Sequence, residues 1–349
     1  MSKEYFDLSS DIQKALIDKA ADQLNISDVA IEKDLWICWI LQQLFDLPLS
    51  MVLKGGTSLS KAYNLINRFS EDVDITLDPH SFQFTVDLEK ATRSSLKKIS
   101  EELQTTLENC IQKTILPHLR KCILRFPNQE KFSIDWDEEE SLRFYYPSVL
   151  SHHFLTSDGD FLLFENENSY LRDHILIEFG ARNNIEPNEK HIITPLLSQI
   201  TFEKPLNFSK TEVDVLSIIR TFWEKTTLIH VECHRKRLRN NPDRLSRHWY
   251  DLAMLKKAGI DKEALSQWKI LEDVVKHKKA FFNASYANYD DCLNNKFRLI
   301  PDDADKKSLE RDYESMKNFG MFSEEPMSFD EILNLLNELE DVLKTSRCV

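Results

Sequence analysis

The spacing of apolar residues divides the start of the chain into two helices and a strand. Residues 9–24 carry a helical pattern, and residues 29–47 are apolar enough to form a largely buried helix. Ser27 can cap this second helix, and Pro48 ends it. The short apolar run at 51–54 directly precedes two glycines, which indicates a strand.

The middle of the chain changes its hydrophobic period several times. Residues 57–69 show helical spacing, whereas residues 73–77 alternate as a strand does. Residues 88–122 predict a helix with mixed charge on its exposed face. Residues 131–147 are aromatic and acidic and become strand-like towards their end, and residues 174–181 give the second clear strand signal.

From Ser209 onwards the pattern becomes helical. Ser209 and Glu212 form a capping box, which predicts the start of a long helix. Residues 247–259 predict a further helix that ends in glycine, and more helices follow. We therefore predict a domain of helices and strands at 1–205 and a helical domain at 206–349.

Composition limits the classes of protein that fit. The chain has 349 residues, of which 42% are apolar and 30% charged, as expected for a helix-rich globular protein. Six scattered cysteines without a CxxC pair fit reduced thiols in a cytoplasmic protein. No apolar run approaches the ~20 residues that cross a bilayer. A net charge of −13 argues against general duplex-DNA binding but allows a local basic groove.

The stretch KGGTSLSKAYNLINRFSEDVDI, at residues 54–75, concentrates the candidate chemistry. Gly55 and Gly56 lie between a predicted strand and a predicted helix, where backbone N–H groups can approach a ligand without an intervening Cβ. A phosphate suits such a helix N-terminus, and Thr57 and Ser58 add hydroxyl donors. Neither a P-loop nor a GxGxxG motif is present. A plain structural turn explains the glycine pair equally well.

Two acids close this stretch. Asp72 and Asp74 lie two residues apart in a predicted strand, so their carboxylates point to the same face. They repel each other unless a cation lies between them, and oxygen ligands of this kind suit Mg²⁺. The alternative is a solvated strand face with two chance acids, although aspartate is disfavoured in strands.

Five segments together resemble one group of enzymes; they are KGGTSL (54–59), RFSEDVDI (68–75), EKDLW (32–36), RTFWEK (220–225) and RLSRHWYDL (244–252). The first two are similar to the signature of the nucleotidyltransferase superfamily. With the other three, the chain resembles the AbiEii/AbiGii toxin family and its MenT-like members over about residues 25–260. The resemblance implies an α+β fold, in which a polymerase-beta-like nucleotidyltransferase domain with a mixed sheet precedes a helical domain that completes the active site.

The resemblance also implies a nucleotide-binding set, namely Gly55, Gly56, Thr57, Ser58 and Arg247. These residues would hold the phosphates of an NTP substrate. His248 follows Arg247 and could contact phosphate too, or it could simply be a histidine packed within its helix.

The same resemblance implies a metal and catalytic set. Asp72 and Asp74 would hold Mg²⁺ or Mn²⁺, with Glu178 as the third ligand, unless Glu178 only faces solvent from a half-buried strand. Lys225 would reach phosphate as a point charge, or would form an ion pair with a neighbouring acid. Asp251 would act as a base for the acceptor hydroxyl or would contact the nucleotide.

A basic cluster lies between the two C-terminal motifs and consists of Arg235, Lys236, Arg237, Arg239, Arg244 and Arg247. It could line a groove for an RNA backbone or a triphosphate. A solvated loop or a docking patch for an acidic partner is the alternative. The pair His152-His153 has no metal-ligand partner at a suitable spacing, so we interpret it as structural. The tryptophans of the helices are expected in the core; they are Trp36, Trp39, Trp223 and Trp249.

The leading hypothesis is a metal-dependent nucleotidyltransferase toxin that moves an NMP group from an NTP to the 3′ end of tRNA. By the same resemblance it would belong to a toxin–antitoxin or phage-defence pair, with a cognate antitoxin such as a winged-helix regulator, and no membrane partner. Two alternatives remain. One is a module that senses a nucleotide or binds a partner without turnover. The other is NMP transfer to protein hydroxyls, which uses the same metal chemistry.

Overall fold

The computed structural model describes residues 3–82, 91–137, 140–150, 171–202, 206–235 and 244–346. The strands are β1 (Lys3–Glu4), β2 (Met51–Lys54), β3 (Val73–Leu77), β4 (Ser133–Asp137), β5 (Ser141–Tyr145), β6 (Ile175–Gly180), β7 (Asn188–Ile193), β8 (Leu206–Asn207) and β9 (Thr211–Leu216). The helices are α1 (Ser10–Leu24), α2 (Asp28–Phe45), α3 (Gly55–Lys61), α4 (Arg93–Cys110), α5 (Leu116–Ile123), α6 (Ile218–His234), α7 (Ser246–Lys257), α8 (Ile260–Ser266), α9 (Trp268–Phe281), α10 (Tyr289–Leu293), α11 (Asp303–Asn318) and α12 (Phe329–Thr345). Short 3-10 or π segments are η1 (Tyr5–Asp7), η2 (Pro79–Phe82), η3 (Ile111–Ile115), η4 (Gln129–Lys131) and η5 (Leu196–Gln199).

A mixed sheet forms the centre of the molecule. Within the described residues its strand order is β4-β5-β6-β3-β2-β9-β7. The pairs β3–β6 and β2–β9 are parallel, whereas the other neighbouring strands are antiparallel. The sheet and the helical C-terminal region confirm the predicted α+β fold class.

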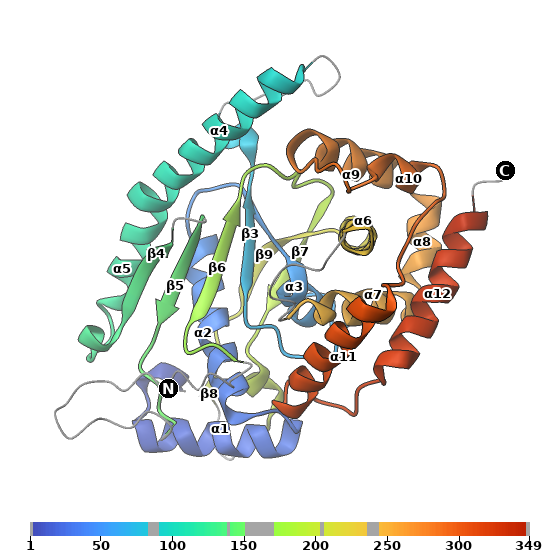
Figure 1. Ribbon diagram of the computed structural model, residues 1–349. Coiled ribbons are helices and arrows are strands. Elements are labelled where there is room, and N and C mark those ends of the chain that lie inside the picture. Colours follow the sequence, from blue (N-terminus) through green and yellow to red (C-terminus); the bar gives the residue numbers. More distant parts are fainter. Residues whose placement is uncertain are drawn as a thin grey trace.

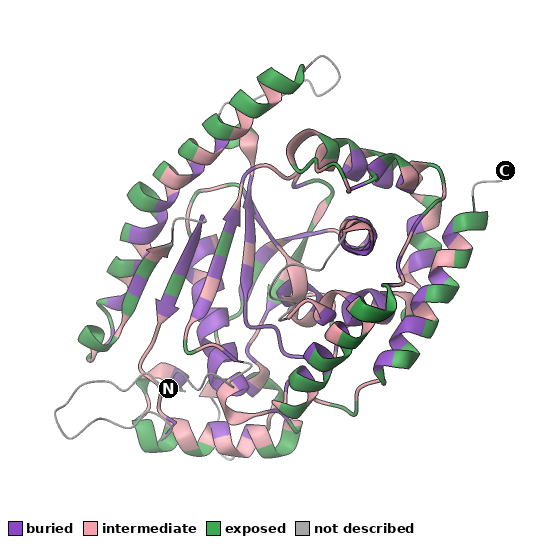
Figure 2. Cartoon of the chain, viewed as in Figure 1, coloured by how far each residue is buried: buried purple, intermediate pink, exposed green. Residues whose placement is uncertain are grey.

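Helices enclose the sheet from two sides (Figure 1). The continuous rod of α4, η3 and α5 runs along the β4–β5 end, and the later helices, α6 to α12, gather beside the other part of the sheet. Figure 2 shows that α6 is buried over most of its surface, whereas α4 keeps an exposed outer face. The sheet needs this cover, because the apolar side chains of a sheet face are buried only where another element packs against that face.

The predicted aromatic core is confirmed. Trp36 and Trp39 of α2 pack against each other and against Phe126 and Phe144, with ring centroids 5.4 to 6.1 Å apart. Trp223 and Trp249 have no exposed surface at all. These tryptophans stabilise the fold by burying large apolar rings.

Several predicted boundaries are confirmed. Helix α2 begins at Asp28, and the Ser27 hydroxyl accepts a hydrogen bond from the Ala30 N–H as an N-cap. Strands β2, β3 and β6 match the predicted strands closely. Helix α7 ends just before Gly259, whose φ of +81° is accessible to glycine at little cost.

The charged residues near the start of α2 are buried and contact other segments of the chain. Glu32, Lys33 and Asp34 are each almost fully buried in the second turn of the helix. Glu32 accepts hydrogen bonds from the Ser148 hydroxyl and from the loop that follows it, and Asp34 forms an ion pair with Lys61. Each charge therefore ties a different segment to α2 instead of facing solvent.

The helix predicted at 57–69 is wrong over most of its length. Helix α3 contains both glycines in its first turn and ends at Lys61. Asn64 adopts a left-handed φ of 53°, a conformation that asparagine tolerates and that ends helices. The chain then runs extended, which brings Arg68 into the interior of the molecule.

The capping box at Ser209 is also wrong, because the segment after it is a strand. Residues Thr211–Leu216 alternate between buried and more exposed positions and pair with β2 and β7. Helix α6 begins later, where the Ser217 hydroxyl accepts from the Arg220 N–H. The β-branched residues of TEVDVL and their partner strands outweigh the local helix signal.

Strand β9 bears on the predicted boundary between the two domains. The predicted boundary at 205/206 falls beside residues 203–205, which lie outside the described ranges, and β9 belongs to the sheet although it comes after that boundary. The change from sheet to helices comes at Ser217. The two-domain division stays a prediction.

The region at 131–147, expected to be strand-like only at its end, is a hairpin of β4 and β5.

Two compositional predictions can be compared with the described part of the chain. The cysteines there are free, and they are Cys38, Cys110, Cys122, Cys233 and Cys292. Among the described residues, no helix combines the length and the apolar character that crossing a membrane requires.

Candidate active site

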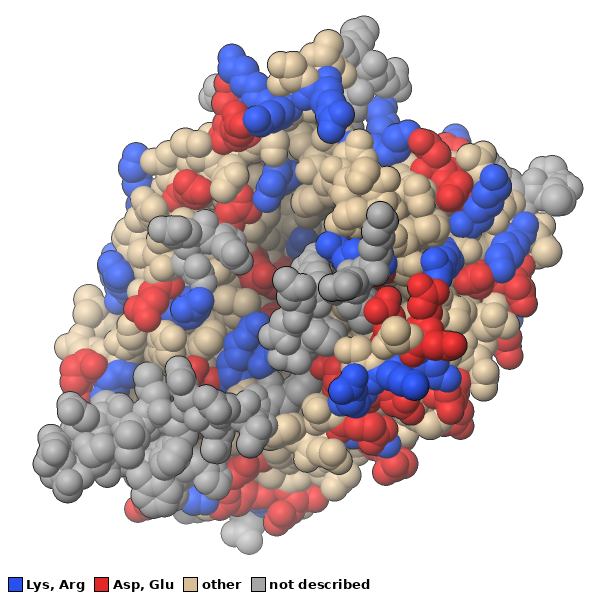
Figure 3. All heavy atoms as spheres, viewed as in Figure 1, with Lys and Arg blue, Asp and Glu red and all other residues tan. Residues whose placement is uncertain are grey.

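A cavity of about 590 Å³ opens between the sheet and the helical region. Strands β2, β3 and β6 form one wall, which we call the sheet wall, and helices α6, α7 and α9 form the other, which we call the helical wall. Figure 3 shows the hollow near the centre of this face, with acidic and basic side chains both reaching it. Every predicted site residue except Thr57 and Ser58 lines this cavity.

The two glycines make room for neighbouring side chains. A Cβ on Gly55 would lie 1.8 Å from Asp74 Oδ2, and Gly55 has a φ of +73°. A Cβ on Gly56 would lie 2.6 Å from both Arg68 Nη2 and Ser70 Oγ. Glycine is therefore required at position 55, whereas a side chain at position 56 would displace Arg68 and Ser70. Both glycines line the cavity.

The two hydroxyls predicted to bind phosphate are fully buried beside the cavity. The Thr57 hydroxyl donates to the Asp72 backbone carbonyl and so ties α3 to the start of β3. The Ser58 hydroxyl donates to the Gly55 carbonyl at 2.9 Å. Both side chains thereby hold the glycine turn and the acid pair in a fixed relation.

Asp72 lies just before β3 and is held by two arginines. Its Oδ1 accepts from Arg172 Nη1 at 2.8 Å, and its Oδ2 accepts from Arg247 Nη1 at 2.7 Å. Burial raises the pKa of Asp72, but the Arg247 and Arg172 charges outweigh burial and hold the pKa below its usual range. Asp72 is therefore ionised, and it connects the sheet wall to α7.

Asp74 and Glu178 lie side by side, because β3 and β6 pair in parallel with these two residues in register. Burial, together with the Asp72 charge, raises the pKa of Asp74 in spite of the nearby Lys54. Glu178 is exposed to the cavity, yet partial enclosure and the charges of Asp74 and Asp72 raise its pKa to about 7. Two carboxylates repel each other when few positive charges lie nearby, and this repulsion adds to the effect of burial in raising both pKa values.

The helical wall holds a buried ion-pair cluster. Asp251 of α7 has no exposed surface and accepts from Lys225 Nζ at 2.8 Å. Arg68 donates to both oxygens of Asp251, at 2.8 and 2.9 Å. Burial would raise the pKa of Asp251, but Arg68 and Lys225 overcome it and hold the pKa far below the usual range. We call Arg68, Lys225 and Asp251 the buried clamp.

His248 of α7 lines the cavity, and the charges of Lys225 and Arg247 act on its ring. Burial and the positive charges of Lys225 and Arg247 push its pKa well below the ordinary value. The imidazole is therefore neutral, so it can exchange a hydrogen bond with a ligand but adds no positive charge for phosphate.

Of the predicted basic cluster, Arg235, Arg244 and Arg247 lie in the described residues, and all three pair with acids. Arg235 donates to Glu232, and Arg244 forms an ion pair with Glu71. The other members, Lys236, Arg237 and Arg239, and the pair His152-His153 lie outside the described residues.

Sequence reasoning missed three cations of this site. Arg68 begins the segment RFSEDVDI, for which no role of the arginine was predicted. Lys54 is the register partner of Asp74 on β2. Arg172 precedes β6 and is 100 residues from its partner Asp72. No local pattern signals such a contact, because sheet topology alone brings the two segments together.

A second buried network braces the site from behind. Glu71 precedes Asp72 and accepts from Lys33 Nζ at 2.8 Å and from the Arg172 backbone N–H at 3.0 Å. Arg244, which enters α7, contacts the other Glu71 oxygen. Helix α2, the sheet wall and the helical wall are thus fastened at one acid next to the candidate catalytic pair.

The sheet wall fits a divalent cation in its chemistry. Hard cations take carboxylate oxygens, and the raised pKa values of Asp74 and Glu178 mark negative charge that a cation would relieve. Among the described residues, however, no group of three His, Cys, Asp or Glu side chains is gathered closely enough to hold a metal. In this arrangement Arg172 and Arg247 satisfy the Asp72 carboxylate.

A family model described as "Nucleotidyl transferase AbiEii toxin, Type IV TA system" matches residues 39–335, which is most of the chain. The chain belongs to the AbiEii nucleotidyltransferase toxin family. This AbiEii-family protein is therefore a nucleotidyltransferase of a toxin–antitoxin system, which implies an NTP substrate and an antitoxin as counterpart. The family resemblance predicted from the five segments is confirmed.

Among solved structures, the AbiEii-family chain is similar to MenT4, the nucleotidyltransferase toxin Rv2826c from Mycobacterium tuberculosis H37Rv. The two are 16% identical, the match covers 97% of this chain and 99% of MenT4, and the TM-score is 0.38. A likeness at that level carries no argument about individual residues. No curated protein matches the chain.

Proposed function

We propose that this protein transfers an NMP group from an NTP to the 3′-terminal hydroxyl of a tRNA, with Mg²⁺ or Mn²⁺ as cofactor. The acceptor oxygen attacks the α-phosphorus, and the bond from that phosphorus to the bridging oxygen of the β-phosphate breaks. Pyrophosphate leaves, and the hydroxyl proton passes to a carboxylate of the site. The observation that carries this proposal is the in-register pair Asp74–Glu178 facing Lys225 across one cavity.

The sheet wall would hold the cation through Asp72, Asp74 and Glu178. A divalent cation held there would supply positive charge to offset the negative charge of the triphosphate and of the pyrophosphate that leaves. The carboxylates supply oxygen ligands of the preferred kind, and a cation offsets the repulsion that raises the pKa of Glu178 to about 7. A cation bound there would compete with Arg172 and Arg247 for the Asp72 oxygens.

The phosphates would lie between the glycine turn and the helical wall. Gly55 and Gly56 expose backbone at the cavity, and Thr57 and Ser58 hold that turn in place. Arg247 reaches the cavity from α7, where a guanidinium can bind phosphate in place of a carboxylate. Its release from Asp72 would couple NTP binding to cation binding.

Asp251 has an orienting role in this proposal. Both of its oxygens are taken by Arg68 and Lys225, and its pKa is held far below the usual range, which makes it a poor proton acceptor. It instead fixes the Lys225 ammonium at the cavity, where that charge can bind phosphate.

The test is transfer of label from each α-labelled NTP, in the presence of Mg²⁺, to total cellular RNA. The proposal expects label on tRNA-sized RNA that periodate treatment of the acceptor 3′ end abolishes. The Asp72→Asn/Asp74→Asn variant should be inactive, whereas Glu212→Gln, which changes an exposed acid on β9, should match the wild type.

Other products would change the acceptor. Label that survives RNase but not protease would identify protein hydroxyls as acceptors and overturn the RNA assignment. Full toxicity of the Asp72→Asn/Asp74→Asn variant in cells would overturn the catalytic proposal altogether. We also propose that the antitoxin is a winged-helix regulator, which co-expression of a neighbouring gene product of that class, with relief of toxicity, would test.

A further inference from the structure

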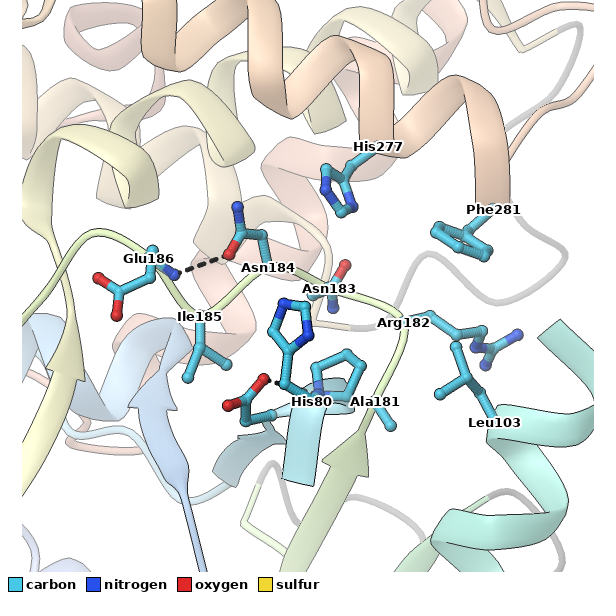
Figure 4. Close-up of a pocket in the computed structure, with 12 residues that line it drawn as sticks. His80, Leu103, Ala181, Arg182, Asn183, Asn184, Ile185, Glu186, His277 and Phe281 are labelled. Carbon is cyan, nitrogen blue, oxygen red and sulfur yellow. Dashed lines mark hydrogen bonds between the residues drawn. The ribbon is translucent and has the colours of Figure 1, made fainter. Parts of the chain in front are cut away.

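A second cavity of about 230 Å³ adjoins the catalytic one (Figure 4). Its walls come from η2, α4, the segment between β6 and β7, and α9. Asn183 lines both cavities, so the two are neighbours across one side chain. Asp78, which lines it, follows Asp74 by four residues, which along an extended strand is about 13 Å. One nucleotide unit can bridge that distance from the sheet wall.

The lining of this second cavity mixes aromatic and uncharged polar side chains with apolar ones such as Leu103 and Ile185, and it also includes the acids Asp78 and Glu186. Figure 4 shows His277 and Phe281 reaching in from α9 and His80 from the opposite side, with Asn183 between them. Arg182 is the cation there, and it is paired with Glu140 and lies over the Phe282 ring. A phosphate would have little free positive charge to bind in such a place.

His277 and Asn183 bring polar side chains to the lining of this cavity. The Nδ1 of His277 is buried and has no hydrogen-bond partner among the described residues. Burial lowers the pKa of His277, so its imidazole is neutral. A neutral imidazole and an amide each offer both a donor and an acceptor.

This combination matches the way proteins recognise an unstacked base. Bases removed from a helix are stacked on aromatic rings and hydrogen-bonded along their edges, and amide side chains read those edges with paired donors and acceptors. Phe281 offers a half-buried ring, while Asn183 and His277 offer the hydrogen-bonding groups. The cavity volume lies just below the ~300 Å³ at which small-molecule sites begin, which suits a planar ring more than a whole nucleotide.

We propose that the cavity between the β6–β7 segment and α9 is a nucleobase subsite of the transferase. The proposal rests on the function proposed above, since the base belongs either to the NTP or to the 3′-terminal nucleotide of the acceptor. Both sources share the chemistry that Phe281, Asn183 and His277 recognise, and one experiment separates them.

The experiment compares full-length wild type with Phe281→Ala and Asn183→Ala. The matched control is Leu124→Ala, which removes an exposed apolar side chain far along the sequence from this cavity. Calorimetry measures binding of each NTP and of inorganic triphosphate, which has no base. Steady-state transfer measures KM for acceptor RNA and for the same RNA with an abasic 3′-terminal residue.

A subsite for the NTP base predicts that NTP binding weakens about tenfold in both variants, as expected for loss of base stacking. Binding of inorganic triphosphate and KM for RNA then stay unchanged. A subsite for the acceptor base predicts the reverse, namely a tenfold higher KM for RNA but an unchanged KM for the abasic RNA. Either pattern supports the proposal.

The proposal is overturned if NTP binding and KM for RNA both stay within twofold of the wild type in correctly folded variants. It is also overturned if inorganic triphosphate or abasic RNA loses as much affinity as its base-containing counterpart. Failure of the proposed function looks different, because the wild type then transfers no label to any RNA. In that case the calorimetric comparison alone decides whether this cavity binds a base.

Discussion

On the sheet wall, Glu178 and Asp74 lie next to each other and share too little positive charge, so burial and mutual repulsion raise the pKa of Glu178 to about 7. On the helical wall, Asp251 lies between Arg68 and Lys225, and its pKa is held far below the usual range. The two walls face one cavity. One wall keeps unbalanced charge available for a ligand, while the other uses balanced charge to position a lysine.

This difference has opposite consequences for substitution. Removing a charge from a repelling pair relieves the folded state, whereas removing one partner from a compensated buried cluster leaves the other charges unpaired. Stability and activity should therefore change in opposite directions for Asp74 and Glu178 on the sheet wall and in the same direction for the buried clamp on the helical wall.

The largest expected effect is on the helical wall. The substitution Asp251→Asn leaves Arg68 and Lys225 buried without their counter-ion, and we expect the free energy of unfolding to fall by roughly 3–5 kcal/mol. Chemical denaturation followed by circular dichroism measures this loss. Asp261→Asn is the matched control, because Asp261 is equally buried but its partner Lys256 is partly exposed and can be hydrated.

A loss in Asp251→Asn no larger than in Asp261→Asn would remove the distinction between a compensated clamp and an ordinary ion pair. Adding Lys225→Met to Asp251→Asn should recover part of the stability but none of the transfer activity, since the ammonium itself is then missing.

The next effect is on the sheet wall and concerns activity. We expect Asp74→Asn to lower the rate of NMP transfer by roughly 10³-fold, because the cation loses a ligand and its charge stabilisation of the transition state falls by several kcal/mol. Thermal unfolding of the same metal-free variant should be no lower than that of the wild type. If Asp74→Asn lost both activity and stability, the charge of Asp74 would be compensated in the folded state, as that of Asp251 is in the buried clamp.

The helical region should also be sensitive to acid. Burial lowers the pKa of His230 to about 4, and the Arg298 backbone N–H donates to its Nδ1 while Nε2 contacts the Asn288 carbonyl. A depressed pKa means that this stability is complete above the unfolded pKa of ~6.5 and is lost as the pH falls towards 4.

Between pH 7 and pH 4 we expect the stability advantage of the wild type over His230→Gln to shrink by roughly 2–3 kcal/mol. Denaturant titrations at several pH values measure the difference. An advantage that is constant over this range would show that His230 has the same pKa in the folded and unfolded states. His234 packs 4.4 Å from the His230 ring and should be kept unchanged in both proteins.

The smallest effect completes the comparison. We expect Glu178→Gln to raise the stability of the metal-free protein at pH 8 by only about 0.5 kcal/mol, because solvent in the cavity screens the repulsion from Asp74. The folded pKa is raised, so the gain grows as the pH rises from ~4.5 to about 7 and is constant above. Differential scanning calorimetry with and without chelator measures it, and a decrease at pH 8 would contradict the unbalanced-charge account.

The sequence alone determined the candidate chemistry of this protein. Adjacent residues carried it, as in the glycine pair at 55–56, the acids Asp72 and Asp74, and the motifs around Lys225 and Asp251. Local patterns also predicted α2, β2, β3, β6 and α7, because their hydrophobic periods and end signals lie within the elements themselves.

Tertiary structure alone decided the partners of these residues. The strand β9 carries a helix-like capping signal, yet pairing with β2 and β7 makes it extended. The glycine pair leaves room for Asp74, 19 residues beyond Gly55, and for Arg68, 12 residues beyond Gly56. Arg172 reaches Asp72 across 100 residues, and Arg68 reaches Asp251 across 183. Pairing energies of this kind depend on distances that only the folded sheet and helices set, so they leave no periodic trace in the sequence.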